Sequence, residues 1–227
     1  MPLLQLPIFP LPLVLFPGAP QLLHIFEPRY REMLADCMDG DRRFGISWVD
    51  SADGPDPSPP AGAVGCTAQV RARTELPDGR SNILTVGEDR YWLREYIDAG
   101  RPYRVARVET FDDDPDSAAD AADLAADVGR AFTRFAAAAK ALSDESASPP
   151  ELAGEPKALS FQVAASIEIE ARIKQELLEL RSTRARLETE RQLLRAVTGE
   201  ISSRAEVHVR ARRNGKGGPN PAIVKGP

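Results

Sequence analysis

The chain is poor in the residue types that most metal and nucleophilic sites require. Its 227 residues include only two cysteines and two histidines. Cys37 and Cys66 have no CxxC or Cys/His spacing and each lies in an apolar pattern, which favours two buried free thiols over a disulfide or a zinc site. His24 alternates with apolar residues and His208 lies near the end of the chain, so a structural or surface role is favoured over that of a catalytic base.

Long apolar runs and early positive charges are absent too. Prolines interrupt the apolar N-terminal segment, and no Lys or Arg precedes Arg29. This pattern fits neither a secretory signal peptide nor a membrane span. We therefore expect a cytoplasmic protein with no membrane partner.

The motifs of ATP hydrolysis and peptide cleavage are also missing. No GxxxxGK(S/T) segment occurs, because the glycines around Lys216 lack the upstream glycine, the hydroxyl residue and a preceding strand. No serine or lysine lies in a recognisable nucleophile setting. Glu27 with Asp36, or the run Asp112–Asp116, could supply paired acids, but a helix N-terminus and a solvated linker explain them better. We expect no enzyme activity and no catalytic, cofactor-binding or metal-ligating residue.

What the chain does have is an unusual opening, LPIFPLPLVLFPGAPQLLHIFEPRYREMLADCMDGDRRFG, from Leu6 to Gly45. Its prolines remove backbone donors from residues 6–16, which predicts a strand at a sheet edge or with a bulge. Pro17 and Gly18 suit the middle positions of a type II turn, since proline presets the first dihedral and glycine accepts the positive one that follows. Residues 21–26 are then expected to return as a second strand.

A helix is expected to begin at Pro28. Glu27 places an acidic group at its N-terminus, and proline needs no N–H at the first helical position. Gly40 suits the C-terminal cap. Apolar residues at spacings of three, four, seven and eight predict one buried face, made of Tyr30, Met33, Leu34, Cys37 and Met38.

Residues 43–111 have the patterns of short strands. The expected strands are Phe44–Val49, Val64–Arg73, Ile83–Val86, Tyr91–Ile97 and Tyr103–Phe111. A hairpin is expected at residues 77–79 and an exposed loop at residues 51–62. Together they predict a small, mostly antiparallel sheet closed into a barrel-like shape. The interleaved aromatic residues are expected to fill the barrel or, as the alternative, to line a peptide groove: Trp48, Tyr91, Trp92 and Tyr96.

The acidic run at 112–116 predicts a solvated hinge, and helical periodicity follows it. Ala121–Leu142 repeats apolar residues at helical spacing, and Ser143–Pro156 predicts a loop. Leu159–Ile169 is apolar nearly all round, as in a helix packed on several sides, and Ile173–Ile201 predicts one or two amphipathic helices. The predicted class is α+β, with a β-rich domain at 1–111, a helical subdomain at 112–201 and a disordered polar, basic tail at 202–227.

A thin apolar seam of residues seven apart runs along this second half. It consists of Leu180, Leu187, Leu194 and Ile201. The companion positions Thr183 and Glu190 are polar, which favours packing within the chain. Self-association through these helices is the alternative use of the seam.

The opening segment resembles the start of the N-terminal, substrate-binding domain of the Lon family of ATP-dependent proteases, which typically combines an LPLFPL strand, an LFPG turn and an LHIFEPRYR strand-to-helix step. LSFQVAASIEIEARIKQELLELRSTRARLETERQLL, from Leu159 to Leu194, is similar to the helical part of the same domain. The likeness covers Leu6 to about Leu194. The family-motif positions, expected to be mostly structural, are Pro7, Phe9, Pro10, Phe16, Pro17, Gly18, His24, Phe26, Glu27, Pro28, Arg29, Tyr30, Phe44 and Gly45.

The resemblance implies a PUA-like antiparallel pseudo-barrel with one amphipathic helix, followed by a helical subdomain. In that family the domain captures unfolded or tagged proteins and helps the subunits to assemble. Because the ATPase and protease motifs are missing, the resemblance implies a stand-alone, non-catalytic protein-binding module, an adaptor or regulator of proteolysis. The expected partners are other proteins, either unfolded segments or a protease, and no cofactor is expected.

Two binding modes are open at this point. A strand weakened by prolines beside apolar side chains would offer a shallow groove to an extended apolar segment. The alternative is RNA binding, because PUA-like barrels elsewhere bind RNA and the tail carries Arg204, Arg210, Arg212, Arg213 and Lys216. The net charge of −5 and the lack of a basic stripe with interleaved aromatics rank RNA second, so nucleic acid is not an expected partner.

Overall fold

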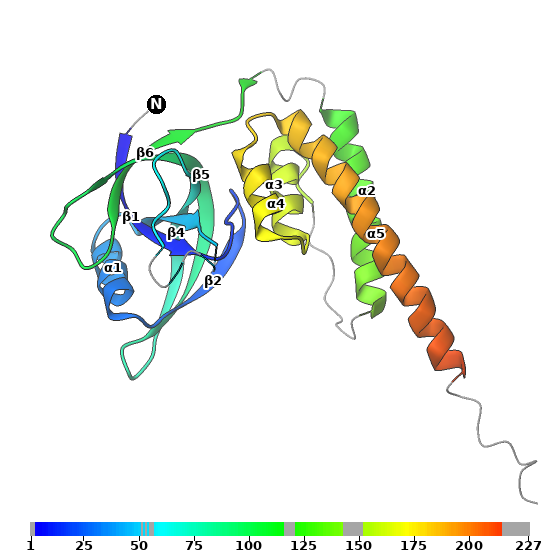
Figure 1. Ribbon diagram of the computed structural model, residues 1–227, viewed down its shortest axis with the longest axis horizontal. Coiled ribbons are helices and arrows are strands. Elements are labelled where there is room, and N and C mark those ends of the chain that lie inside the picture. Colours follow the sequence, from blue (N-terminus) through cyan, green and yellow to red (C-terminus); the bar gives the residue numbers. More distant parts are fainter. Residues whose placement is uncertain are drawn as a thin grey trace, which may run out of the picture.

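The computed structural model describes residues 3–50, 52, 54, 57–115, 121–142 and 152–214, with the side chains of 141–142 and 200–214 left outside this description. The elements in chain order are β1 (Leu3–Leu11), β2 (Pro20–Ile25), α1 (Pro28–Asp39), β3 (Arg43–Trp48), β4 (Val64–Glu75), β5 (Ser81–Ile97), β6 (Val105–Phe111), α2 (Ala122–Leu142), α3 (Pro156–Ser166), α4 (Ala171–Glu179) and α5 (Thr183–Asn214). Figure 1 shows the strands and α1 gathered in one half, the β half, and α2 to α5 in the other, the helical half. The predicted α+β class is confirmed.

The strands of the described residues form one mixed sheet in the order β2-β5-β4-β3-β1-β6. β6 pairs with β5 as well as with β1, so the pairings from β5 round to β6 close a ring. β1 and β3 run parallel, and the other pairs are antiparallel. The expected mostly antiparallel sheet is therefore present, and the ring of pairings gives it a barrel-like closure.

The sequence predicted a first strand at a sheet edge or with a bulge, and the edge position is wrong, because β1 pairs with two other strands. Leu3–Pro7 pairs with β6, and Ile8–Leu11 pairs with β3. The first part of β1 is thus paired on the β6 side and the second part on the β3 side. A proline whose missing N–H faces the other side removes no ladder hydrogen bond, which accommodates Pro7 and Pro10 in a strand that crosses the sheet.

The expected turn and first helix are confirmed. Gly18 has a φ of +77°, and the Ala19 N–H donates to the Phe16 carbonyl over 3.0 Å, as a type II turn requires. α1 begins at Pro28 and buries the predicted face of Tyr30, Met33, Leu34 and Cys37. Met38, the fifth predicted member, packs partly buried against the same core.

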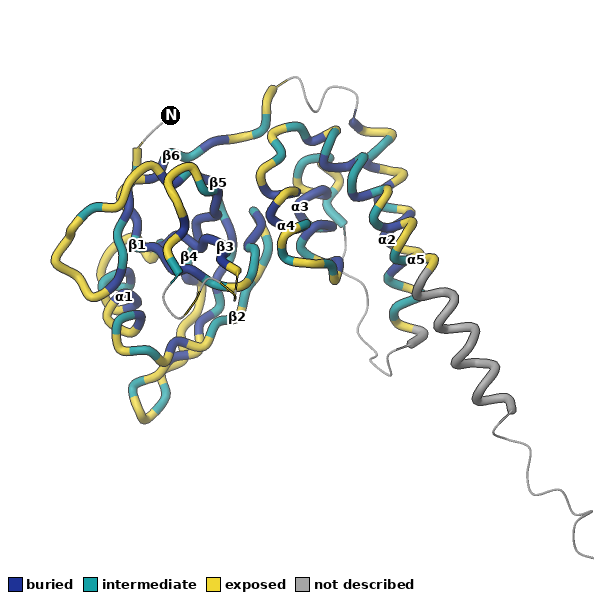
Figure 2. Tube along the Cα trace, viewed as in Figure 1, coloured by how far each residue is buried: buried dark blue, intermediate teal, exposed yellow. Residues whose placement is uncertain are grey.

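Buried residues concentrate in the ring of strands, under α1 and along α3 (Figure 2). Cys37 and Cys66 are free and buried there, as predicted. Burial raises the pKa of the Cys37 thiol to about 12 and raises that of Cys66 as well. Thiols held in the neutral form are poor nucleophiles, so both cysteines act as core residues.

One strand boundary differs from the prediction. Ile83–Val86 and Tyr91–Ile97 were expected as two strands, but both belong to the single strand β5. This length lets β5 pair with β2, β4 and β6, with a register shift between Leu93 and Glu95 on the β6 side. A glycine inside a strand pattern need not end the strand, and Gly87 lies within β5.

In the helical half, α2 and α5 pack side by side, and α3 and α4 lie between them and the β half (Figure 1). The seam residues Leu187 and Leu194 are buried in the core that α2, α3 and α5 share. Packing within the chain is thus confirmed for these two residues. Their polar companions Thr183 and Glu190 are buried as well.

The last helix runs further than the sequence predicted. α5 continues to Asn214, so residues 202–214 of the expected tail are described as helix, and they are rich in the helix formers Ala, Arg and Glu. Residues 215–227 of the predicted tail lie outside the described residues. No helix in the described ranges is both long and apolar enough to cross a membrane.

Candidate functional site

The two halves share a small core where α3 and α4 meet the β half. Phe16, Val64 and Phe111 pack there with Phe161, Leu177 and Leu178 of the helical half. The ring centroids of Phe16 and Phe161 lie 6.4 Å apart. The turn that follows Phe16 is therefore held beside α3.

An open apolar groove lies beside this shared core, between that turn and α3. Its volume is about 460 Å³, and no described residue of its walls has an ionisable side chain. One wall is Pro17, Gly18, Ala19 and Pro20, and the other is Ala153, Ala158, Phe161, Gln162, Ala165 and Ser166. We call these residues the apolar groove.

The turn wall is fixed to the sheet by its backbone. The Gly18 N–H donates to the Gly87 carbonyl over 2.8 Å, and the Gly87 N–H donates to the Ala19 carbonyl over 3.0 Å. A Cβ atom at position 87 would lie 2.1 Å from the Phe16 carbonyl oxygen, so only glycine allows this close approach. The wall is preorganised rather than a mobile loop.

The helical wall is built from small side chains on a capped helix. The carboxylate of Glu155 accepts from the backbone N–H of Lys157 over 3.1 Å and of Ala158 over 2.8 Å, which satisfies donors at the start of α3. Ala158 and Ala165 present only methyl groups to the groove. Phe161, 2% exposed, connects the wall to the shared core.

A second pocket adjoins the apolar groove and shares Ala19, Pro20 and Ala165 with it. Its volume is about 270 Å³, and its other lining residues are Pro12, Leu13, Val14, Leu15, Gln21, Ile169, Ala171 and Lys174. We call it the adjoining pocket. The two hollows together offer a path along the junction of the halves.

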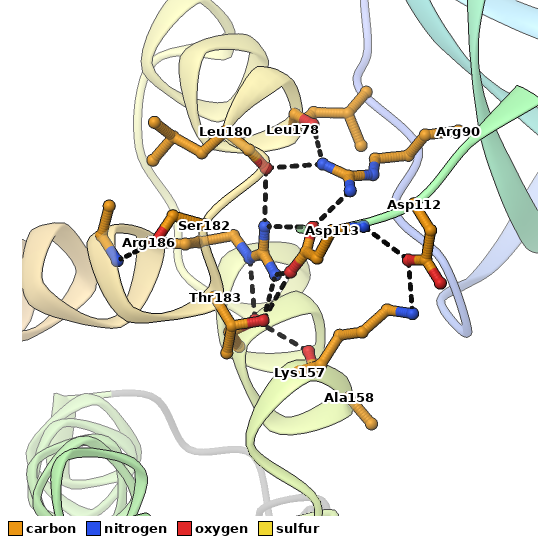
Figure 3. A network of polar contacts seen from close by, with 12 residues as sticks. Arg90, Asp112, Asp113, Lys157, Ala158, Leu178, Leu180, Ser182, Thr183 and Arg186 are labelled. Carbon is orange, nitrogen blue, oxygen red and sulfur yellow. Dashed lines mark hydrogen bonds and ion pairs between the residues drawn. The ribbon is translucent and has the colours of Figure 1, made fainter. Parts of the chain in front are cut away.

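A buried ion network lies next to the shared core and joins three parts of the chain (Figure 3). The guanidinium groups of Arg90 on β5 and Arg186 on α5 both bond the carboxylate of Asp113. Thr183 donates to the same carboxylate over 2.5 Å, and both arginines donate to the Leu180 carbonyl. The two arginine side chains are 2% and 0% exposed, so the network is out of contact with water.

This network corrects the prediction of a solvated acidic hinge at 112–116. Asp112 and Asp114 are exposed as expected, but the side chain of Asp113 is only 6% exposed. Burial alone would raise the pKa of Asp113, but the hydrogen bonds and charge of Arg186, aided by Thr183 and Arg90, outweigh burial and lower it. The ionised carboxylate holds the two halves together. Residues 116–120, which include Asp116, lie outside the described residues.

A third hollow of about 240 Å³ lies nearby and has a charged lining that includes Glu88, Arg90, Asp112 and Lys157. These charges have partners within the protein. Lys157 pairs with Asp112 at 2.6 Å and Glu88 with Arg43 at 2.9 Å. The apolar groove is therefore the better candidate for a recognition site.

The family-motif residues divide between the core and the groove. Phe9, Tyr30 and Phe44 belong to the core of the β half, and Gly45 lies against the Tyr91 ring, where a Cβ atom would be 2.6 Å from its hydroxyl oxygen. Pro7 and Pro10 lie in β1, and Pro28 begins α1. Pro17 and Gly18 line the apolar groove, and Phe16 supports it from the shared core.

The remaining motif residues lie on the surface near β2. Phe26 is 58% exposed and stacks with His24, whose Nδ1 lies 2.7 Å from Asn82 Oδ1. Glu27 forms no capping hydrogen bond and instead pairs with Arg29 at 3.0 Å. His24 thus has the surface position that the sequence favoured. The side chain of His208 lies outside the described residues.

The four aromatic residues of the strands do not reach the groove. Tyr91 is fully buried, with its hydroxyl 2.8 Å from Ser47 Oγ, and Trp92 stacks on Phe111. Tyr96 donates to the Pro59 carbonyl, and Trp48 is half-buried. None of these four residues lines the apolar groove, so the alternative prediction that they line a peptide groove does not apply to it.

Reasoning from the sequence missed the helical wall and the ion network. Ala158 and Ala165 look like ordinary helix formers, and nothing local distinguishes Arg90 from an exposed strand arginine. Two signals were available: the nearly continuous apolar pattern at 159–169, which placed that helix against several neighbours, and the polar Thr183 within an apolar seam. The basic residues of the RNA-binding alternative fall at 204–216, where no side chain is described.

Comparisons with known proteins give a consistent result. The model of a family described as the ATP-dependent protease La (LON) substrate-binding domain matches residues 5–196. The Lon proteases of Brucella suis biovar 1 and Brucella melitensis biotype 1 are each 25% identical over 202 residues, which cover 88% of this chain and 25% of theirs. The chain therefore spans about a quarter of the length of these relatives, and the match does not reach their catalytic domains.

Solved structures share the fold. A Lon N-terminal domain protein from Xanthomonas campestris matches with a TM-score of 0.57 at 21% identity, over 82% of this chain and 96% of that one. The N-terminal domain of a Mycobacterium avium complex Lon protease matches with a TM-score of 0.63 at 13% identity, over 86% and 98%. At these identities the likeness is one of fold.

Proposed function

The chain belongs to the family of the ATP-dependent protease La (LON) substrate-binding domain, and from this premise we propose that it recognises extended apolar segments of other proteins without catalysing a reaction on them. The single observation that carries this proposal is the apolar groove. It is open, lacks ionisable side chains among its described walls and lies where the family's turn motif meets α3. Unfolded proteins expose apolar segments that folded ones bury.

The groove favours recognition with low sequence specificity. Its walls offer methyl groups, proline rings and Phe161, and only a few polar atoms that could select a partner group. Because the groove buries little area, we expect a dissociation constant on the order of micromolar for one segment. Such weak binding suits an adaptor or regulator of proteolysis that must release its client, and a partner protease remains part of this proposal.

The test is binding of a permanently unfolded protein, such as reduced and alkylated lactalbumin, measured by fluorescence anisotropy. Ala165→Glu places a charge where the apolar groove and the adjoining pocket meet and is expected to weaken binding by about tenfold, or roughly 1.4 kcal/mol. Ala126→Glu, at an exposed position of α2, makes the same change away from the groove and should leave binding unaltered. The proposal fails if the unaltered chain does not bind, or if both variants bind equally well.

A further inference from the structure

We propose that Lys174 forms an anion subsite in the adjoining pocket, and that the preferred occupant of the groove and pocket is an apolar segment ending in its free C-terminal carboxylate. This inference rests on the function proposed above and specifies the substrate class. The inference follows from the position of one charged side chain among the otherwise uncharged residues that line the groove and the pocket. Within the described linings of the apolar groove and the adjoining pocket, Lys174 is the one ionisable residue.

A hydrogen bond from its side chain to a backbone carbonyl holds Lys174 against the groove wall. It lies in the first turn of α4, and its Nζ donates to the carbonyl of Ala165 over 3.1 Å. Ala165 in turn lines both the apolar groove and the adjoining pocket. The ammonium group is therefore held beside the junction of the two hollows and does not extend freely into water.

The charge of Lys174 lacks a counter-ion in the described part of the chain. No carboxylate there forms an ion pair with it, whereas Lys157 pairs with Asp112 at 2.6 Å. Burial lowers the pKa of Lys174, and the field of Glu168 opposes this only in part. A partly desolvated ammonium without a counter-ion is costly, so an incoming carboxylate would gain a charge-assisted hydrogen bond.

The apolar surroundings favour a chain end over an internal acidic residue. Leu13, Leu15 and Ile169 line the pocket beside Lys174. A C-terminal residue brings an apolar side chain and a carboxylate to the same place, since both are attached to one Cα atom. An internal Asp or Glu would instead put its own polar side chain against the apolar walls.

The experiment uses the full chain and three peptides with one shared apolar sequence, compared by fluorescence anisotropy. The first ends in a free carboxylate, the second in an amide, and the third in an amide with aspartate as its last residue. The free acid is expected to bind about tenfold more tightly than the simple amide, and less so at high salt. Lys174→Met should abolish this difference, and Lys174→Arg should retain much of it.

Lys140→Met, at an exposed position of α2, is the matched control and should keep the full preference. Circular dichroism of each variant establishes that it is folded. Equal binding of acid and amide by the unaltered chain would overturn the subsite and leave the proposed function standing. Equal binding of the aspartate amide and the free acid would overturn the assignment to a chain end. If no peptide and no unfolded protein binds, the proposed function itself fails.

Discussion

Glu190 is a buried acidic residue of the helical half. It lies on α5 with no exposed surface, and neither carboxylate oxygen has a hydrogen-bond partner among the described residues. Burial raises its pKa well above the ordinary 4.5, although the charge of Arg186 opposes this. The folded state therefore favours the protonated, neutral carboxyl.

The pH dependence of stability follows from this shift. The stabilisation due to protonation of Glu190 is fully present below the unfolded pKa and is lost as the pH rises through the raised folded pKa. Glu190→Gln removes the ionisable group, so it should raise the free energy of unfolding at pH 8 by about 1–3 kcal/mol and give no such gain at pH 4. Urea denaturation at both pH values measures this difference.

Glu188→Gln, at a half-exposed position on the same helix, serves as the control and should have little effect at either pH. A loss of stability in Glu190→Gln at pH 8 would show that the ionised carboxylate has a favourable role.

At the scale of elements, the ion network decides how the helical half sits on the β half. Asp113 lies in the link after β6, and its two arginine partners come from β5 and α5. The network thus ties segments that are distant in sequence, and the shared core lies next to it. The groove depends on the same placement, since its walls come from opposite halves.

Asp113→Ala should destabilise the protein by about 3–5 kcal/mol, because it leaves two buried guanidinium groups without their carboxylate. Asp114→Ala removes the neighbouring exposed carboxylate, which pairs with Arg181, and should cost less than about 1 kcal/mol. Chemical denaturation of both variants makes the comparison. Equal, small losses would mean that the arginines find other partners.

At the scale of the whole molecule, the shared core makes the two halves one folding unit. Phe16 and Phe111 pack with Phe161 and Leu177 across the junction, so neither half can lose its structure without exposing apolar surface of the other. Cooperative unfolding is the expected consequence.

Two probes test this cooperativity. Both tryptophans, Trp48 and Trp92, lie in the β half, whereas most helix lies in the other half. Tryptophan fluorescence and the circular dichroism of the helices should therefore give coincident denaturation curves. In Phe161→Ala, which costs about 3–5 kcal/mol at the junction, the two curves should separate. Separate curves in the unaltered chain would contradict a single folding unit.

Local patterns in the sequence were sufficient for the opening of the chain. The turn at Pro17 and Gly18 and the helix from Pro28 follow from backbone chemistry that acts within a few residues. The position of β1 between β3 and β6 was not predictable in this way, because its prolines are accommodated by a change of partner from β6 to β3 along the strand. Strand pairing depends on residues far away in the sequence.

The β-then-α order, the buried faces of the helices and the family resemblance could be derived from the sequence alone, since each depends on short-range periodicity or contiguous motifs. The folded arrangement was needed to show that Asp113 is buried between two arginines and that a turn near residue 18 faces α3 across an apolar groove. The physical reason is that burial and charge pairing are properties of distant segments brought together. A local sequence pattern indicates whether a segment is apolar, but it does not indicate which distant segment packs opposite it.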